Sequence, residues 1–323
     1  MPGGVTTGNP LTAIESELVE RMRGSDIISV RQFRPDELRT LLGIVQRFEG
    51  DTPPLLLGKV LGALFFEPST RTRLSFESAM LRLGGSVIGF ADAGITSATK
   101  GETLQDTLRI VENYCDVIVI RHPREGAARA AAEATTRPVV NGGDGANQHP
   151  TQTLLDLYTI QRRLGRVSGL RIGFLGDLKY GRAAHSLVEA AAMLGNELVL
   201  VAPPSLRLPS RRLEELAALG ATYEETSELG PTLPTVDVLY VTRIQQERFA
   251  DPLDFERVRN AYQIDRETVD RGKEGMIVMH PLPRVNEIHP SVDASPRAAY
   301  FEQAKNGVTV RKALLALLMG AVS

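Results

Sequence analysis

Cysteine is almost absent from this sequence, which has 323 residues and a single cysteine, Cys115. One cysteine excludes an intramolecular disulfide and a zinc site built from several thiolates. Cys115 opens the mostly apolar run Cys115–Ile120, so we expect a buried core thiol rather than a nucleophile. Scarce cysteine also fits a reducing compartment, and we therefore expect a cytoplasmic protein.

Strong net charge and long apolar runs are absent as well. The formal net charge is −2, which argues against a general nucleic-acid binder, so any anion site must come from local clusters of Arg and Lys. No apolar run reaches the roughly 20 residues that cross a bilayer, and we expect no membrane partner. The segment Met1–Pro10 has neither a basic start nor an apolar stretch. We interpret it as a loose tail rather than a signal peptide.

Short apolar segments alternate with amphipathic ones along the rest of the chain. The apolar segments are rich in Val, Ile, Leu and Phe without polar alternation, which is typical of strands buried on both faces of a parallel sheet. The predicted strands are Val60–Phe66, Ser86–Phe90, Asp116–Ile120, Pro138–Val140, Arg171–Leu175, Glu197–Val201, Val236–Val241 and Met276–Met279. The predicted helices are Thr72–Leu83, Thr103–Glu112, Gly126–Glu133, Thr151–Leu164, Ala183–Leu194 and Ser210–Leu219. This alternation predicts an α/β fold.

The length of the chain predicts two domains, each a parallel β-sheet flanked by helices. A short polar stretch, Gly165–Gly169, separates two sets of strands and helices. We place the domains at 1–150 and 151–299. A final helix is expected over Lys305–Met319, and the segment of about 300–323 that contains it is expected to return to the first domain.

Polar clusters follow the predicted strands repeatedly. In open α/β sheets, ligands bind beyond the carboxyl ends of the strands, so we expect these clusters to converge on one place. The clusters are Glu67–Arg73, Arg121–Pro123, Asn141–Gln152, Asp177–Arg182, Thr242–Gln245 and His280–Arg284.

The segment Ser69–Arg73 lies where a predicted strand gives way to a predicted helix. The first N–H groups of a helix have no internal partner and carry the positive end of the helix dipole. A phosphate can accept hydrogen bonds from them and from the hydroxyls of Ser69, Thr70 and Thr72. The guanidinium of Arg71 can pair with it. An ordinary N-cap followed by solvated arginines is the alternative, but three hydroxyls interleaved with two arginines favour an oxyanion site.

The stretch Phe65–Arg73 resembles the carbamoyl-phosphate signature of the aspartate and ornithine carbamoyltransferases. The resemblance implies the carbamoyltransferase fold, with 1–150 as the carbamoyl-phosphate-binding domain and 151–299 as the aspartate-binding domain. It implies that the phosphate is held by Ser69, Thr70, Arg71 and Thr72. Thr72 would also reach the carbamoyl oxygen.

Other residues of the first domain match the same family. The run Gln148–Gln152 resembles its His-Pro-Thr-Gln motif, which implies that His149 donates a hydrogen bond to the carbamoyl oxygen and that Gln152 binds the carbamoyl amide. A neutral imidazole can be that donor. Arg121 resembles the arginine that contacts both phosphate and carbonyl oxygen. The implied catalytic residues are therefore Arg71, Thr72, Arg121 and His149.

The polar loop before Thr103 would be a plain surface loop on pattern alone. Its Lys-Gly-Glu-Thr run resembles a loop that the family donates to the active site of a neighbouring subunit. The resemblance implies a homotrimer with shared active sites, in which Ser97 and Lys100 act in trans and Lys100 also binds aspartate. A separate regulatory chain is a further partner that the sequence leaves open.

The second domain would hold the amino acid. Arg182 resembles the arginine that grips the α-carboxylate of aspartate, and Arg243 with Gln245 resembles the clamp on its side-chain carboxylate. In the turn His280–Arg284, the backbone carbonyls of Leu282 and Pro283 would face the carbamoyl amide. The ornithine enzymes place a cysteine in this turn, and none is present here. Glu67 and Arg248 would form an ion pair on domain closure.

The resemblance implies transfer of a carbamoyl group from carbamoyl phosphate to the amine of L-aspartate, with no cofactor and no metal. Three alternatives stay open. An ornithine-type enzyme would differ around Arg182, Arg243 and Leu282. A nucleotide-binding oxidoreductase shares the fold class, but the G-x-G-x-x-G spacing is missing at Gly176–Arg182. A catalytically silent relative should have lost Arg71, Arg121 or His149, and all three are present.

Overall fold

The computed structural model describes residues 10–246, 249 and 251–322. Contacts divide the chain into two compact units. Unit 1 comprises the described residues up to Tyr158 together with those from Lys305 onward, and unit 2 runs from Thr159 to Ala304. The divisions therefore fall inside two helices, which are α6 (Pro150–Leu164) and α12 (Tyr300–Leu318).

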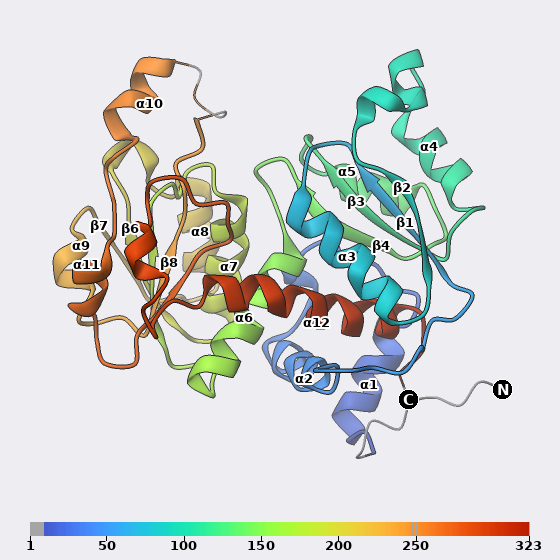
Figure 1. The fold of residues 1–323 in the computed structure, drawn as a ribbon, viewed down its shortest axis with the longest axis horizontal. Coiled ribbons are helices and arrows are strands. Elements are labelled where there is room, and N and C mark those ends of the chain that lie inside the picture. Colours follow the sequence, from blue (N-terminus) through green and yellow to red (C-terminus); the bar gives the residue numbers. More distant parts are fainter. Residues whose placement is uncertain (1–9, 247–248, 250, 323) are drawn as a thin grey trace. The chain divides into compact units, whose positions relative to one another are not determined.

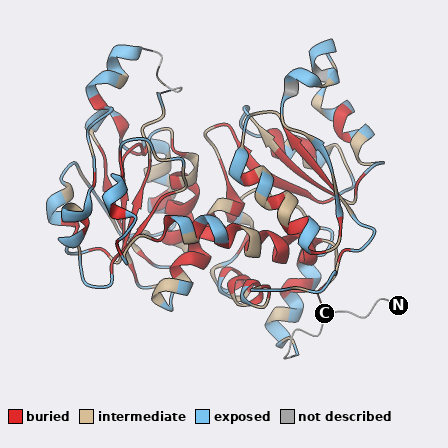
Figure 2. Ribbon diagram, viewed as in Figure 1, coloured by how far each residue is buried: buried red, intermediate tan, exposed pale blue. Residues whose placement is uncertain are grey.

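Unit 1 is built on a parallel sheet of four strands in the order β2-β1-β3-β4 (Figure 1). The strands are β1 (Val60–Phe65), β2 (Ser86–Phe90), β3 (Val117–His122) and β4 (Val139–Asp144). Strands β1, β3 and β4 are buried along most of their length (Figure 2). Cys115 lies in the core beside them, and burial raises the pKa of its thiol to about 11. The expectation of a core thiol is confirmed.

Helices cover this sheet and bring the two ends of the unit together. The helices wholly within unit 1 are α1 (Ala13–Met22), α2 (Pro35–Gln46), α3 (Thr70–Arg82), α4 (Leu104–Val111) and α5 (Ala127–Glu133), with short 3₁₀ helices η1 (Val30–Gln32), η2 (Ala93–Ile95) and η3 (Ser97–Lys100). Helix α3 packs on β1 and β2, and α5 packs on β3 and β4. The end of α12 lies beside the start of the chain, because the Gly24 N–H donates to the Leu318 carbonyl at 2.8 Å.

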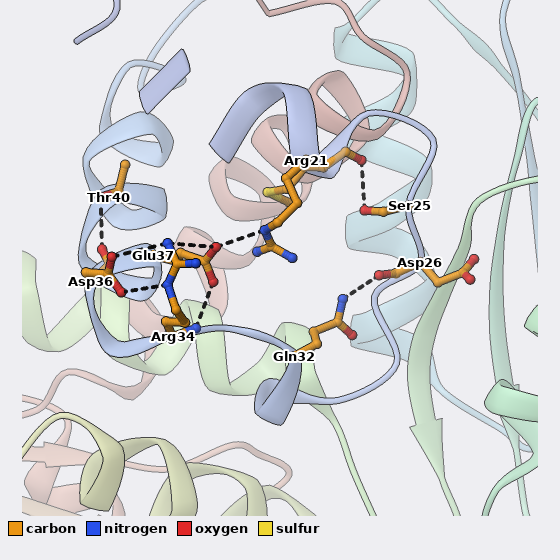
Figure 3. Close-up of polar contacts among 9 residues, drawn as sticks. Arg21, Ser25, Asp26, Gln32, Arg34, Asp36, Glu37 and Thr40 are labelled. Carbon is orange, nitrogen blue, oxygen red and sulfur yellow. Dashed lines mark hydrogen bonds and ion pairs between the residues drawn. The ribbon is translucent and has the colours of Figure 1, made fainter. Parts of the chain in front are cut away.

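A buried carboxylate joins α1 to α2 (Figure 3). Glu37, in the first turn of α2, accepts from the Arg34 backbone N–H at 2.8 Å and pairs with Nε of Arg21 from α1 at 2.9 Å. Pro35 opens α2, where the missing N–H of proline costs nothing. The start of α2 is therefore fixed by local capping, and two ion pairs join it to α1, since Arg47 at the end of α2 also pairs with Glu15 of α1 at 2.8 Å.

Unit 2 is built on a parallel sheet of five strands in the order β7-β6-β5-β8-β9. The strands are β5 (Arg171–Leu175), β6 (Glu197–Val201), β7 (Tyr223–Thr226), β8 (Val238–Val241) and β9 (Ile277–Met279). The helices wholly within this unit are α7 (Arg182–Met193), α8 (Ser210–Ala218), α9 (Leu229–Thr232), α10 (Pro252–Val258) and α11 (Arg266–Asp270), with 3₁₀ helices η4 (Pro204–Leu206) and η6 (Pro290–Val292). Strand residues such as Val199, Leu239 and Val278 form its core.

The α/β architecture with two parallel sheets is the one that the sequence predicts. Every predicted strand has an observed counterpart, although the ends shift by a few residues. The apolar pattern does not predict β7, because this strand is polar and forms an outer edge that is only partly buried. The helices α1, α2, α9, α10 and α11 are not among the predicted ones, although Leu38, Leu41, Leu42 and Val45 have the spacing of an amphipathic helix.

The final helix begins at Tyr300, so the predicted start at Lys305 is wrong. Gly307 indicates a helix start in the sequence, but it lies inside α12. Its missing side chain leaves room for Arg311, because a Cβ on Gly307 would lie 2.4 Å from the guanidinium. No helix among the described residues is long and apolar enough to cross a membrane.

The division of binding functions between 1–150 and 151–299 stays a proposal. The contact-based divisions fall at Tyr158 and Ala304, a few residues after these limits. Periodicity marks where a helix lies in the sequence but not which unit each of its turns packs against.

Replacing Gly89 by alanine is expected to destabilise unit 1. Gly89 has φ of +144°, and a Cβ there would lie 2.0 Å from the carbonyl oxygen of Ala63 in β1. The strained backbone and the overpacking together cost about 2–4 kcal/mol. Gly58→Ala is the control, because its φ is +75° but no atom lies within 4 Å of the added carbon. A loss of about 1 kcal/mol is expected for this control. Urea unfolding measures both variants, and equal losses would contradict this explanation.

Candidate active site

Helix α3 begins soon after β1, and the side chain of its N-cap residue does not cap it. Ser69 is the N-cap residue, has an extended conformation, and makes no side-chain capping hydrogen bond. By contrast, α1 and α4 are capped by the hydroxyls of Thr12 and Thr103. The Ser69 hydroxyl therefore does not occupy the place at α3 where an anion would meet the first N–H groups and the positive end of the dipole.

The predicted phosphate ligands lie in and before the first turn of α3. Thr70 and Arg71 are exposed, whereas Ser69 is half-buried and Thr72 is buried. Arg73 pairs with Glu77 along the same helix at 3.0 Å. Arg71 is thus the exposed arginine of this turn, and Arg73 belongs to the helix surface.

Two residues predicted to contact the carbamoyl oxygen lie side by side. The hydroxyl of Thr72 is 3.4 Å from Nε2 of His149, and both side chains are buried. His149 directly precedes α6, and the loop before it is held by Asp144. The Asp144 carboxylate accepts from the Gly126 N–H at 2.8 Å and from the Gln148 N–H at 3.1 Å. This loop keeps the imidazole next to the start of α3.

Arg121 lies at the end of β3, opposite Phe65 of β1 in the sheet register. Its guanidinium pairs with Glu67 at 2.8 Å and donates to the Gly142 carbonyl at 3.2 Å. The side chains of the ion pair are 14% and 19% exposed. Removing one partner of a largely buried ion pair is costly, so an incoming anion must give Arg121 a partner as good as Glu67.

Gln152 lies in the first turn of α6, where its amide is oriented by a carboxylate. Its Nε2 donates to Oδ1 of Asp156 at 2.8 Å. An ionised carboxylate only accepts hydrogen bonds, so the NH₂ end of the amide faces Asp156. The amide oxygen is the end left to accept an N–H from a ligand.

Ser97 and Lys100 lie in η3, on the surface of unit 1. Both side chains are exposed. No hydrogen bond or ion pair among the described residues joins either one to the cluster at the start of α3. Within one chain, these two predicted residues are therefore not tied to the other predicted ligands.

In unit 2, Asp177 joins the two loops that carry the predicted aspartate ligands. Its Oδ1 accepts from the Tyr180 N–H at 2.9 Å, and its Oδ2 accepts from the Gln245 N–H at 3.3 Å. Burial raises the pKa of Asp177, although the backbone N–H groups and the charge of Arg243 oppose the rise. The loop after β5 is thereby fixed to the loop after β8.

Three of the residues predicted to bind the amino acid come from these loops. Arg182 is the first residue of α7, whose N-cap residue makes no side-chain capping bond. Arg243 and Gln245 follow β8, which is the neighbour of β5 in the sheet. All three side chains are half-buried. Arg248, predicted to pair with Glu67, lies outside the described residues.

The turn after β9 supplies Leu282 and Pro283. Leu282 has φ of +56° and precedes a cis peptide bond to Pro283. Leu282 is half-buried and Pro283 is exposed. Leu282 thus has a left-handed backbone conformation that leucine rarely adopts.

The structure brings many predicted residues together within each unit, but the sequence reasoning missed the carboxylates that hold them. Asp144, Asp177 and Glu287 accept backbone N–H groups of the loops that carry the predicted ligands. For the first two a signal was available, because each directly follows a glycine after an apolar strand. Aspartate in such a loop often accepts from nearby backbone N–H groups.

Family models match most of the chain. The model described as the carbamoyl-P binding domain of aspartate/ornithine carbamoyltransferase matches residues 25–162. The model described as the Asp/Orn binding domain of the same family matches residues 168–318. The two matches follow one another along the sequence.

Whole-chain relatives agree with these models. The aspartate carbamoyltransferase catalytic subunit of Thermococcus onnurineus is 56% identical over 305 residues, which cover 93% of this chain and 98% of that protein. The catalytic subunit of M. jannaschii aspartate transcarbamoylase has a TM-score of 0.83 and 49% identity, covering 90% of this chain and 96% of that one. Aspartate transcarbamoylase from Trypanosoma cruzi, solved with carbamoyl phosphate and aspartate, has a TM-score of 0.88 and 41% identity, covering 93% and 98%. This chain belongs to the aspartate/ornithine carbamoyltransferase family.

Proposed function

We propose that this chain transfers the carbamoyl group of carbamoyl phosphate to the amine of L-aspartate, in pyrimidine biosynthesis. The products are N-carbamoyl-L-aspartate and phosphate. The observation that carries the proposal is the start of α3, which the Ser69 side chain does not cap, with Thr72 beside His149. Support for aspartate as the acceptor comes from the relatives, which are named for it, and from the Trypanosoma cruzi relative solved with both substrates.

The donor binds at the start of α3. The phosphate accepts hydrogen bonds from the first N–H groups of the helix and from the hydroxyls of Ser69 and Thr70, and Arg71 adds a charge-assisted pair. Arg121 exchanges Glu67 for the donor's phosphate and carbonyl oxygens. Because Arg121 is already desolvated and held by the Gly142 carbonyl, it needs little reorganisation to do so.

The substrate amine is the nucleophile, so no covalent enzyme intermediate is needed. As the amine adds to the carbamoyl carbon, negative charge grows on the carbonyl oxygen. Thr72, Arg121 and His149 stabilise that charge with fixed hydrogen-bond donors. The bond from carbon to the phosphate oxygen then breaks, and the departing phosphate accepts the proton of the amine.

Other groups orient the carbamoyl amide. The oxygen of Gln152 accepts one of its N–H groups, since the other end of that side chain is bound to Asp156. The backbone carbonyls of Leu282 and Pro283 accept from the carbamoyl amide and the attacking amine. These contacts place the reacting atoms, and placement of this kind is a large part of the rate enhancement for reactions of two substrates.

The acceptor side favours aspartate over ornithine. Arg182 binds the α-carboxylate, which both amino acids carry. Arg243 and Gln245 bind the side-chain carboxylate, and the cationic side chain of ornithine would meet Arg243 with like charge. Lys100 adds a further cation. The family includes both acceptors, so this choice rests on these residues and on the names of the relatives.

We propose a homotrimer in which Ser97 and Lys100 complete the active site of a neighbouring subunit. Both residues are exposed in the single chain. Exposed apolar side chains support association: Ile88 lies on the edge strand β2, and Leu74 and Leu81 lie two turns apart on α3. A separate regulatory chain is a further candidate partner, since the relatives are named catalytic subunits. The proposed location is the cytoplasm, which the single cysteine fits.

The variant Arg71→Ala tests the phosphate site. We expect kcat/KM for carbamoyl phosphate to fall at least about 10²-fold, because a charged partner of the transferring group is lost. The control is Arg82→Ala, at the other end of α3, where the guanidinium donates to the Ser78 hydroxyl on the helix surface at 3.2 Å. It should keep near-normal activity. Near-normal activity in the Arg71 variant would overturn the donor site.

The variant Arg243→Ala tests the acceptor. Its KM for aspartate is expected to rise about 10–100-fold, the cost of one charge-assisted hydrogen bond. Arg212→Ala, which breaks a pair with Glu215 on α8, is the control in the same unit. Assays of the unmodified chain with aspartate and with ornithine complete the test, and ureido product from ornithine alone would contradict the assignment.

Subunit mixing tests the trans loop. Arg71→Ala and Lys100→Ala should each be inactive, yet both should keep a native mass of about three chains. Dissociated and reassociated together in equal amounts, they should regain about one quarter of full activity, because that share of sites joins an intact Arg71 to an intact Lys100 from a neighbour. No recovery in a mixed trimer would contradict shared sites.

A further inference from the structure

A buried His–Glu pair lies beneath the turn that contributes Leu282 and Pro283. His280 is 1% exposed and Glu287 is 6% exposed. The Nε2 atom of His280 lies 2.7 Å from Oε1 of Glu287. Both residues belong to the segment between β9 and α12. Neither is among the proposed substrate contacts.

The hydrogen bonds of His280 fix its tautomer. The backbone N–H of Leu282 donates to Nδ1 at 2.7 Å, so Nδ1 carries no proton. Nε2 therefore carries the proton and donates it to the Glu287 carboxylate. The backbone N–H of His280 is also bound, to Oε1 of Gln303 at 2.9 Å. The imidazole is thus a fixed bridge from Glu287 to the backbone of Leu282.

Glu287 uses both of its oxygens. Oε2 accepts from the N–H groups of Val285 and Asn286, each at 3.1 Å. Burial raises the pKa of Glu287, but the hydrogen bonds from the His280 side chain and the Val285 N–H outweigh it, and the pKa lies below its usual value. The carboxylate therefore stays ionised and holds both ends of the turn.

This pair controls the direction of a peptide group. The Pro281–Leu282 peptide is planar, so an N–H that points at His280 directs the Pro281 carbonyl away from it. The backbone dihedral angle φ of Leu282, which follows this peptide group, is +56°. A leucine rarely adopts this value, so surrounding contacts must hold it. The contacts of His280 and Glu287 on either side of Pro283 do so.

We infer that His280 and Glu287 are positioning residues for carbamoyl transfer. They hold the turn so that the carbonyls of Leu282 and Pro283 accept hydrogen bonds from the carbamoyl amide. This inference rests on the proposed function and adds residues that act through the backbone of the turn. His280 and Glu287 thereby help the turn to recognise the N–H groups of the carbamoyl amide.

The variant Glu287→Gln tests the pair, because an amide has one accepting oxygen and the carboxylate uses two. Acetyl phosphate is the probe, since its methyl group replaces the amide and cannot donate. We expect kcat/KM for carbamoyl phosphate to fall about 10–100-fold from misplaced acceptors. The inhibition constants of acetyl phosphate and inorganic phosphate should stay within about twofold, because neither ligand needs the turn's carbonyls.

Two sets of variants separate positioning from stability. Asp237→Asn is the matched control: its carboxylate also uses both oxygens, accepting from the Arg171 N–H at 2.9 Å and from Lys273 at 2.6 Å, but it lies before β8. The Asp237→Asn variant should have lower thermal stability but an unchanged preference for carbamoyl phosphate over acetyl phosphate. His280→Asn keeps an acceptor near Nδ1 and should lose less of that preference than His280→Leu.

The inference is overturned if Glu287→Gln prefers carbamoyl phosphate over acetyl phosphate as strongly as the unmodified chain does. It is also overturned if carbamoyl phosphate, acetyl phosphate and inorganic phosphate all weaken by the same factor. If Glu287→Gln does not fold, His280→Asn and His280→Leu are compared by their preference for carbamoyl phosphate over acetyl phosphate. An equal preference in the two variants overturns the inference. Failure of the proposed function is a separate result, because the unmodified chain would then form no carbamoyl aspartate.

Discussion

Repulsion between two anions is the constraint on which the proposed chemistry depends. Carbamoyl phosphate and aspartate must be held close enough to react, and their repulsion grows as water is excluded. The chain has a net charge of −2, so positive potential has to be local. In unit 1 it comes from the start of α3 and from Arg121 at the end of β3. In unit 2 it comes from Arg182 and Arg243, which follow neighbouring strands. Parallel strands deliver these groups to one edge of each sheet.

Cations on loops are useful only if the loops are rigid, and buried carboxylates provide that rigidity. Asp144 holds the loop before α6, Asp177 joins the loops after β5 and β8, and Glu287 holds the turn after β9. Each accepts backbone N–H groups that would otherwise need water. A carboxylate beside an arginine also weakens the local positive potential. The arginines therefore attract the anionic substrates less strongly, but the loops that carry them have a fixed geometry. Fixed geometry contributes more to a reaction whose nucleophile is itself a substrate.

The sequence predicts the strands and the phosphate motif because each is a local property. Continuous apolar runs mark buried parallel strands, and hydroxyls with arginines at a helix start mark an oxyanion site. The partners of the predicted residues are not local. That Thr72 meets His149, and that Arg121 meets Glu67, depends on the strand order β2-β1-β3-β4 and on which faces the helices cover. Polar β7 is not predicted because it lacks the short apolar runs that mark buried strands. Helices α1 and α2 do carry local signals, which are the capping box of Thr12 and Glu15 and the helical spacing of Leu38, Leu41 and Leu42, but the predicted helices do not include them.

The most direct test of the account is a crystal structure of this chain with N-(phosphonacetyl)-L-aspartate, which joins analogues of both substrates in one molecule. We expect the phosphonate to accept hydrogen bonds from the first N–H groups of α3 and from Ser69, Thr70 and Arg71. We also expect the two carboxylates to contact Arg182 and Arg243. A phosphonate bound away from α3, or carboxylates that contact neither arginine, would contradict the central claim.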